Sequence, residues 1–204
     1  MEAQQLLESL RGHRLEALWL VMLTIGLRPG EAAGLTWADL DLESGRVTVR
    51  HSLQRKNSRP QLVDSLKTER SRRTIALPAI TVEALRRHRI AQAAERLAAS
   101  AWKDDRLVFA STSGYVLEPR SISRQLSKAT EAAGLGHWTP NELRHSAASL
   151  LSDAGVPLER VADLLGHTNT RMLERTYRHS AQPAIDAAAP MAWMLSDEAA
   201  TGEA

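Results

Sequence analysis

The stretch LEALWLVMLTIGLRPGEAAGL, residues 15–35, contains the helix around which we expect the domain to pack. Residues 15–25 are apolar on nearly all sides, which is typical of a helix enclosed by other helices. Gly26 ends this helix, and Pro29 lies near the first turn of a second one, where its missing N–H breaks no hydrogen bond. The sequence therefore predicts a mostly helical domain with a buried helix at its centre.

Helical patterns also occupy much of the remaining chain, while residues 102–115 have the pattern of a loop that contains one short apolar stretch, LVFAS. We predict helices over residues 80–99, 119–133, 139–154 and 157–165, and two more within RMLERTYRH (171–179) and AIDAAAPMAWML (184–195). Gly166 follows the helix of residues 157–165 as its C′ residue, so that His167 comes directly after the terminating turn.

Three segments read as short strands: RVTVRHSL (46–53), QLVDSLK (61–67) and SRRTIALP (71–78). Their β-branched residues alternate with polar ones, and polar turns separate them, which favours an antiparallel arrangement. The expected fold class is mainly α with a small three-stranded antiparallel sheet (α+β).

Charge is distributed unevenly along the 204 residues. Residues 46–89 contain 12 Lys or Arg against 3 acidic residues, whereas the rest of the chain contains 14 against 21. Such a segment is often only a solvated face, but it also suits a surface that binds a polyanion. With no cysteine and no run of apolar residues long enough to cross a bilayer, we expect a soluble protein of the cytoplasm or nucleoid with no membrane partner.

The stretch TPNELRHSAASLL (139–151) contains a charge that opposes its own helix. Thr139, Pro140 and Glu142 fit an N-cap, an N1 proline and the partner of a capping box. Arg144 lies one turn inside this start, where the positive end of the helix dipole disfavours a cation. The sequence therefore predicts an anionic partner for Arg144.

Single residues elsewhere have ordinary explanations. Arg28 fits an ion pair with Glu31, and Lys67 fits a hairpin turn that gains solubility from its charge. His167 fits a helix C-cap, since a lone histidine without a carboxylate cluster makes a poor metal site. Tyr177 fits packing against Leu173 one turn earlier.

Taken together, the order and spacing of Arg28, Lys67, Arg144, His167 and Tyr177 resemble the active-site signature of the tyrosine recombinases, the phage integrase family. The first arginine box matches GLRPGEAAGLTWADLDL (26–42), and the lysine hairpin matches LKTERSRRTIALP (66–78). The second arginine box matches NELRHSAASLLSDAG (141–155), and the nucleophile box matches LLGH (164–167) with ERTYRH (174–179). The resemblance covers nearly the whole chain and implies the fold of a tyrosine recombinase catalytic domain.

The resemblance implies a chemistry as well as a fold. Tyr177 would attack a DNA phosphate and form a 3′-phosphotyrosyl link, with Arg28, Arg144 and His167 donating to the phosphate oxygens. Lys67 would protonate the departing 5′-oxygen, and Glu31 would orient Arg28. The family needs neither a metal ion nor ATP for this reaction, so no cofactor is expected.

Asn141 departs from the commonest family pattern, which has histidine three residues before the second arginine. An amide cannot take up a proton near neutral pH, so Asn141 cannot act as a base for Tyr177. We still assign it to the catalytic set, and either His167 or water would assist, or the enzyme would be slow. His145 points about 100° further around the helix and does not easily replace it.

The expected partner is double-stranded DNA at attachment sites, bound by a tetramer that assembles on DNA from free monomers. The expected DNA contacts lie in and beside the lysine hairpin: Arg55, Lys56, Arg70, Arg72 and Arg73. We assign residues 1–180 to the catalytic domain and 181–204 to a C-terminal tail, and we expect the N-terminal core-binding domain of the family to be absent. Two interpretations of the tail stay open: a helix exchanged between protomers, or a segment that packs within its own chain or is disordered.

Two alternatives stay open at the level of the sequence. The chain could be a catalytically weak DNA-binding fragment or regulator derived from an integrase, which Asn141 and the missing domain favour. A metal-dependent nuclease or transposase would need clustered carboxylates, and the sequence DLD at residues 39–41 is too little for that.

Overall fold

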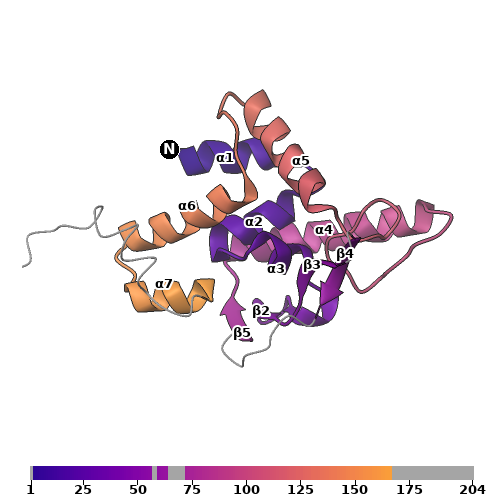
Figure 1. The fold of residues 1–204 in the computed structure, drawn as a ribbon, viewed down its shortest axis with the longest axis horizontal. Helices are drawn as coiled ribbons and strands as arrows, with labels where there is room; N and C mark the ends of the chain where they lie inside the picture. Colours follow the sequence, from indigo (N-terminus) through magenta and orange to yellow (C-terminus); the bar gives the residue numbers. More distant parts are fainter. Residues whose placement is uncertain (1, 57–58, 64–71, 167–204) are drawn as a thin grey trace, which may run out of the picture.

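The computed structural model describes residues 2–56, 59–63 and 72–166, and Figure 1 shows how their helices and strands are arranged. In chain order the elements are α1 (Glu2–Leu10), α2 (Glu16–Ile25), α3 (Pro29–Ala33), the 3-10 helix η1 (Trp37–Asp39), β1 (Leu40–Asp41), β2 (Arg46–Val49), β3 (Ser52–Lys56), β4 (Arg59–Val63), β5 (Arg73–Ala76), α4 (Ala79–Ala98), α5 (Pro119–Ala132), α6 (Pro140–Asp153) and α7 (Leu158–Leu165).

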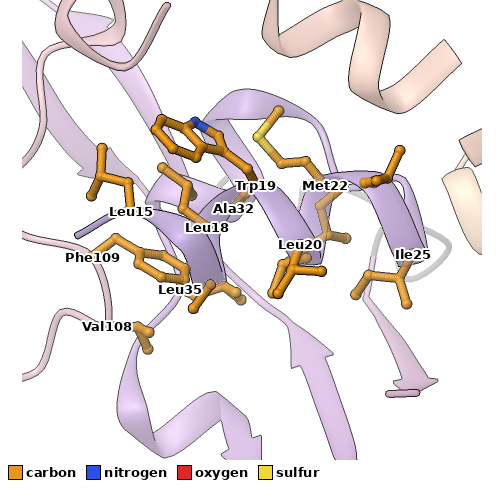
Figure 2. Packing of buried hydrophobic residues seen from close by; sticks show 14 of the residues in the cluster. Leu15, Leu18, Trp19, Leu20, Met22, Ile25, Ala32, Leu35, Val108 and Phe109 are labelled. Carbon is orange, nitrogen blue, oxygen red and sulfur yellow. The ribbon is translucent and has the colours of Figure 1, made fainter. Parts of the chain in front are cut away.

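The central helix predicted from the sequence is α2. It contacts both α4 and α6 (Figure 1). Its residues from Ala17 to Leu23 are all buried. Trp19 and Met22 belong to the same apolar cluster as Phe109, which comes from the loop that follows α4 (Figure 2). A helix covered on several sides needs an apolar residue at nearly every position, which explains why its sequence shows no polar stripe.

The strands differ from the prediction in their partners. The segment 46–53 does not form one strand, because the chain leaves the first sheet after Val49 and begins a second sheet at Ser52. The three-stranded antiparallel sheet has the order β1-β2-β5, and β3 and β4 form a separate two-stranded sheet. The very short β1 was not expected from the sequence, so the fold class is confirmed but the membership of the predicted sheet was wrong.

The predicted loop over residues 102–115 is confirmed, and its apolar stretch is held in place by backbone hydrogen bonds. Val108 donates to Leu35 O at 2.9 Å, and its own carbonyl lies 2.7 Å from His88 Nε2 on α4. Gln92 Nε2 donates to the same carbonyl at 2.9 Å. These bonds satisfy a buried backbone that belongs to no strand, which is why the loop can enter the core.

The predicted helices from α4 to α7 are confirmed with ends within about two residues. α1 was not predicted, although its Leu6 and Leu10 are buried in the core. The two helices expected after residue 167 lie outside the described residues. No helix in the described part of the chain is long and apolar enough to span a membrane.

Two glycines let α3 approach β3 closely. A Cβ atom added to Gly30 would lie 2.7 Å from Leu53 O, and one added to Gly34 would lie 3.0 Å from Leu53 N. Both neighbours are backbone atoms, so a side chain cannot simply turn away to make room. This contact matters for function because Arg28 is the N-cap residue of α3.

We expect Gly30→Ala to lower the free energy of unfolding by about 1–2 kcal/mol, because overpacking against Leu53 O outweighs the helix propensity gained by alanine. Urea unfolding of the two proteins measures the change. Gly134→Ala is the control, since its left-handed φ of 73° adds strain but its Cβ would meet nothing within 4 Å. An unchanged or higher urea midpoint for Gly30→Ala would contradict the close approach.

Candidate active site

α6 begins as its sequence predicts. The N–H of Glu142 donates to Thr139 Oγ1 at 3.4 Å, and the N–H of Thr139 donates to Glu142 Oε2 at 2.6 Å. Pro140 is the first helical residue. This capping box fixes the first turn of the helix and so gives the side chain of Arg144 a defined direction.

The guanidinium of Arg144 is buried and donates to the ends of two other helices. The residue is 8% exposed. Nη1 donates to Gly26 O at the C-cap of α2, and Nη2 donates to the carbonyl of Leu165, the last residue of α7, at 2.9 Å. A helix C-terminus carries partial negative charge and favours a cation. Two helix ends thus place carbonyl oxygens against this guanidinium, while the anionic partner expected from the sequence stays a prediction.

Arg28 donates to the same end of α7 from a position more than 130 residues earlier in the chain. Its Nη2 donates to Gly166 O at 3.1 Å and its Nη1 to Leu165 O at 3.5 Å. Nη1 also lies 3.0 Å from Glu31 Oε1, which confirms the ion pair predicted between them. The Arg28 side chain is 46% exposed. It is therefore more accessible to a ligand than the buried Arg144.

Glu31 is shared between two arginines. Its Oε2 accepts from the backbone N–H of Arg28 at 3.0 Å and from Arg73 Nη2 at 2.8 Å, while its Oε1 accepts from Arg73 Nη1 at 3.3 Å. Burial alone would raise the pKa of this carboxyl, but the hydrogen bonds and charges of Arg73 and Arg28 outweigh it and lower the pKa below its ordinary value of 4.5. Glu31 is therefore held as a carboxylate.

This lowered pKa predicts how stability responds to acid. Because the pKa is lower in the folded chain than in the unfolded one, ionised Glu31 stabilises the fold above pH 4.5, and this contribution is lost as the pH falls through the folded value. Glu31→Gln should lower the free energy of unfolding by about 3 kcal/mol at pH 7, since it leaves buried arginine charge uncompensated. Urea unfolding at several pH values should show the gap between the two proteins narrowing below pH 4.5. A gap that stays constant in acid would contradict the assignment.

Three guanidiniums surround the C-terminal end of α7. Arg73 completes the set, since its Nε donates to Leu164 O at 2.8 Å. Helix α7 ends at Gly166, whose left-handed φ of 65° suits glycine, and His167 is the next residue of the chain. The structure thus brings Arg28 and Arg144 together at the point where the chain continues toward His167 and Tyr177.

The other predicted site residues are placed as follows. Asn141 is exposed on the first turn of α6, three residues before Arg144. Arg55 and Lys56 are exposed on β3, and Arg72 is exposed just before β5. Lys67, Arg70, His167 and Tyr177 lie outside the described residues.

Sequence reasoning missed that Arg73 is largely enclosed by the protein. Its side chain is 10% exposed and uses all three guanidinium nitrogens within the protein. The expected DNA contact of Arg73 remains a prediction that nothing in the structure tests. The alternation of β5 carried the missing signal, because Arg73 shares a strand face with the buried Ile75 two residues on.

Metal ligands can be assessed only in the part of the chain that the structure describes. There, no group of three or more His, Asp or Glu side chains is placed to hold a metal ion.

A sequence model of the phage integrase family matches residues 1–183, which is most of the chain. The chain belongs to the phage integrase family. Membership confirms the resemblance drawn from the two arginine boxes, the lysine hairpin and the nucleophile box. It also gives the convergence of Arg28 and Arg144 its context, because the two arginine boxes are adjacent in space although far apart in sequence.

Two curated relatives cover nearly all of this phage integrase family member. An integrase of Streptomyces ambofaciens is 37% identical over 201 residues, which make up 92% of this chain and 50% of that protein. A tyrosine recombinase XerC-like protein of Caldanaerobacter subterraneus subsp. tengcongensis is 32% identical over 190 residues, covering 87% of this chain and 49% of that protein. The chain spans about half the length of the curated relatives it matches.

Solved structures of this family have the same fold. The Tn1549 transposon integrase in complex with transposon right end DNA aligns with a TM-score of 0.75 at 21% identity, over 95% of this chain and 64% of that one. The XerA recombinase aligns with a TM-score of 0.69 at 22% identity, over 89% of this chain and 62% of that one. The predicted fold of a tyrosine recombinase catalytic domain is confirmed.

Proposed function

We propose that this chain is the catalytic part of a site-specific DNA recombinase that breaks and rejoins strands through a 3′-phosphotyrosyl intermediate. The observation that carries the proposal is the meeting of Arg28 and Arg144 at the end of α7, directly before His167. Two guanidiniums held side by side suit a phosphodiester, because each can donate two parallel hydrogen bonds while staying charged.

The reaction conserves the number of phosphate ester bonds. The phenolic oxygen of Tyr177 attacks the phosphorus, the new P–O bond to tyrosine forms, and the bond to the 5′-oxygen breaks. The phenol gives up its proton to His167 or to water, and the departing 5′-oxygen takes one from Lys67. A 5′-hydroxyl of another strand then attacks the phosphotyrosine and reverses the step, so neither water nor ATP is consumed.

The arginines act on the charge that develops during attack. Negative charge grows on the phosphate oxygens as the fifth oxygen approaches, so donors aimed at them favour the transition state over the ground state. The buried Arg144 is held by Gly26 O and Leu165 O, which makes it a fixed donor. The more exposed Arg28 is oriented by Glu31. His167 is the further donor in this assignment.

Binding to the duplex should be driven mainly by phosphates. Arg55, Lys56 and Arg72 are exposed near the lysine hairpin, where they can contact the DNA backbone. A second exposed basic row, which the sequence analysis did not single out, follows one face of α5 at Arg120, Arg124 and Lys128. Each phosphate contact releases counterions, so the logarithm of affinity should fall steeply with the logarithm of salt concentration.

A library of randomised duplexes tests the proposal whatever the target sequence is. Each duplex carries a nick close to the candidate phosphate, so that the short 5′-hydroxyl fragment diffuses away after cleavage and traps the protein on DNA. We expect a covalent adduct that resists denaturant and forms at the same rate in EDTA as in buffer, because arginines take the place of a metal ion. An adduct that requires a divalent metal would overturn the proposal.

A second candidate function is a catalytically weak DNA-binding fragment or regulator, which Asn141 favours. The amide at this position cannot accept the phenolic proton of Tyr177. The same assay separates the two candidates, since the fragment would bind the library with a steep salt dependence but form no adduct. Assembly into a tetramer on DNA through residues 181–204 belongs to the recombinase proposal, and these residues lie outside the described part of the chain.

A further inference from the structure

We propose that Arg73 is a positioning residue for the phosphate site. Its guanidinium offsets the negative charge of Glu31 and fixes the end of α7, so that Arg28 stays available to the scissile phosphate. This inference rests on the proposed function. It gives Arg73 a role different from the DNA contact expected from the sequence.

The backbone of Arg73 is itself well fixed. It is the first residue of β5 and pairs with the buried Val49 of β2, the central strand of the three-stranded sheet. Its guanidinium reaches away from this sheet to two other elements, α3 through Glu31 and α7 through Leu164. Arg73 therefore joins the three-stranded sheet, α3 and α7.

The charges explain why the shared carboxylate matters. Glu31 pairs with Arg73 at 2.8 Å and with Arg28 at 3.0 Å. Arg73 is the more buried of the two, and its pairing offsets the one negative charge of Glu31. Without Arg73, that charge would act on Arg28 alone and would compete with the phosphate for its guanidinium. Arg73 thus lets one carboxylate orient Arg28 without cancelling it.

The end of α7 depends on the same side chain. Arg73 Nε donates to Leu164 O at 2.8 Å. Arg144 donates to the next carbonyl, Leu165 O, and Arg28 to the one after it, Gly166 O. A Cβ atom added to Gly166 would lie 2.8 Å from Arg73 Nη1, so a side chain here would have to displace this guanidinium.

A double-mutant cycle tests the inference with the nicked duplex. Arg73→Met keeps an unbranched stem and removes the guanidinium with its charge, and Glu31→Gln removes the negative charge of the carboxylate. At saturating DNA, each single variant should form adduct about tenfold more slowly than the wild-type chain. The double variant should also be about tenfold slower, rather than about a hundredfold, because Arg73 and Glu31 both act through Arg28. DNA affinity should change by less than about twofold, since many phosphate contacts share it.

A matched cycle separates positioning from stability. Arg14 and Glu95 form a similar fork, with Arg14 Nε and Nη2 each 2.7 Å from a Glu95 oxygen, between the start of α2 and α4. Arg14→Met and Glu95→Gln should lower the melting temperature but leave the rate of adduct formation per folded molecule unchanged. If Arg73→Met does not fold, Arg73→Lys retains the charge without the fork and should lose less of the rate than the tenfold expected above.

Two results would overturn the inference in distinguishable ways. In the first, the wild-type chain forms adduct, but the losses of rate in Arg73→Met and Glu31→Gln multiply in the double variant, or Arg73→Met weakens only DNA binding. The positioning role is then wrong and the proposed function stands. If the wild-type chain forms no adduct while it binds DNA, the proposed function fails and this inference fails with it.

Discussion

Replacing Tyr177 by phenylalanine is expected to abolish the covalent adduct with nicked DNA completely. The substitution removes one oxygen atom and leaves the ring, so packing and DNA contacts should be preserved. No other group can take over, because attack requires an oxygen nucleophile placed in line with the departing 5′-oxygen. DNA affinity should stay within about twofold of the wild-type value, since the phenol adds no charge to the phosphate contacts.

The chain offers a matched control for this experiment. It contains 2 tyrosines, and the other, Tyr115, is 57% exposed on the loop before α5. Tyr115→Phe should form adduct at the wild-type rate. Gel electrophoresis under denaturing conditions measures the adduct, and peptide mapping identifies the attached residue. Persistence of the adduct in Tyr177→Phe would remove this residue from the proposed mechanism.

Replacing Arg144 by lysine should slow adduct formation by about a thousandfold or more, the cost of losing a fixed donor to a developing oxyanion. A lysine keeps the charge, but its single ammonium cannot reproduce the two separate bonds to Gly26 O and Leu165 O. The loss should therefore appear in the rate at saturating DNA and much less in DNA affinity.

Stability must be measured beside the rate for Arg144→Lys. A buried carbonyl left without its donor costs about 1–3 kcal/mol, so a lower melting temperature is expected as well. Arg96→Lys is the control, because Arg96 makes an exposed ion pair with Asp105 at 3.4 Å. A rate for Arg144→Lys within about tenfold of wild type would exclude Arg144 as the principal phosphate donor.

Local features of the fold followed from the sequence. The apolar run before Gly26 predicted the buried helix α2, and the capping pattern of Thr139 and Glu142 predicted the start of α6 to the residue. Gly166 in a left-handed conformation ends α7 as expected. These features are readable because capping, helix termination and hydrophobic pattern depend on residues within about one or two turns of each other.

Strand pairing was less readable. The segment 46–53 has the alternation of one strand, yet it contributes to two separate sheets because the chain turns after Val49. Alternation shows which residues share a face, but it does not show which segment lies alongside. For this reason β1 was missed, and β4 was assigned to the wrong sheet.

The candidate site, too, has features that the sequence predicted and features that only the structure showed. The sequence by itself determined the family, the residues of its motifs and the ion pair between Arg28 and Glu31, since these depend on order and short spacing along the chain. Only the tertiary structure decided that Arg73 pairs with Glu31, and that three arginines surround the carbonyls at the end of α7. Those contacts join residues more than 20 positions apart, and their geometry depends on how α2, α3, β5, α6 and α7 pack together.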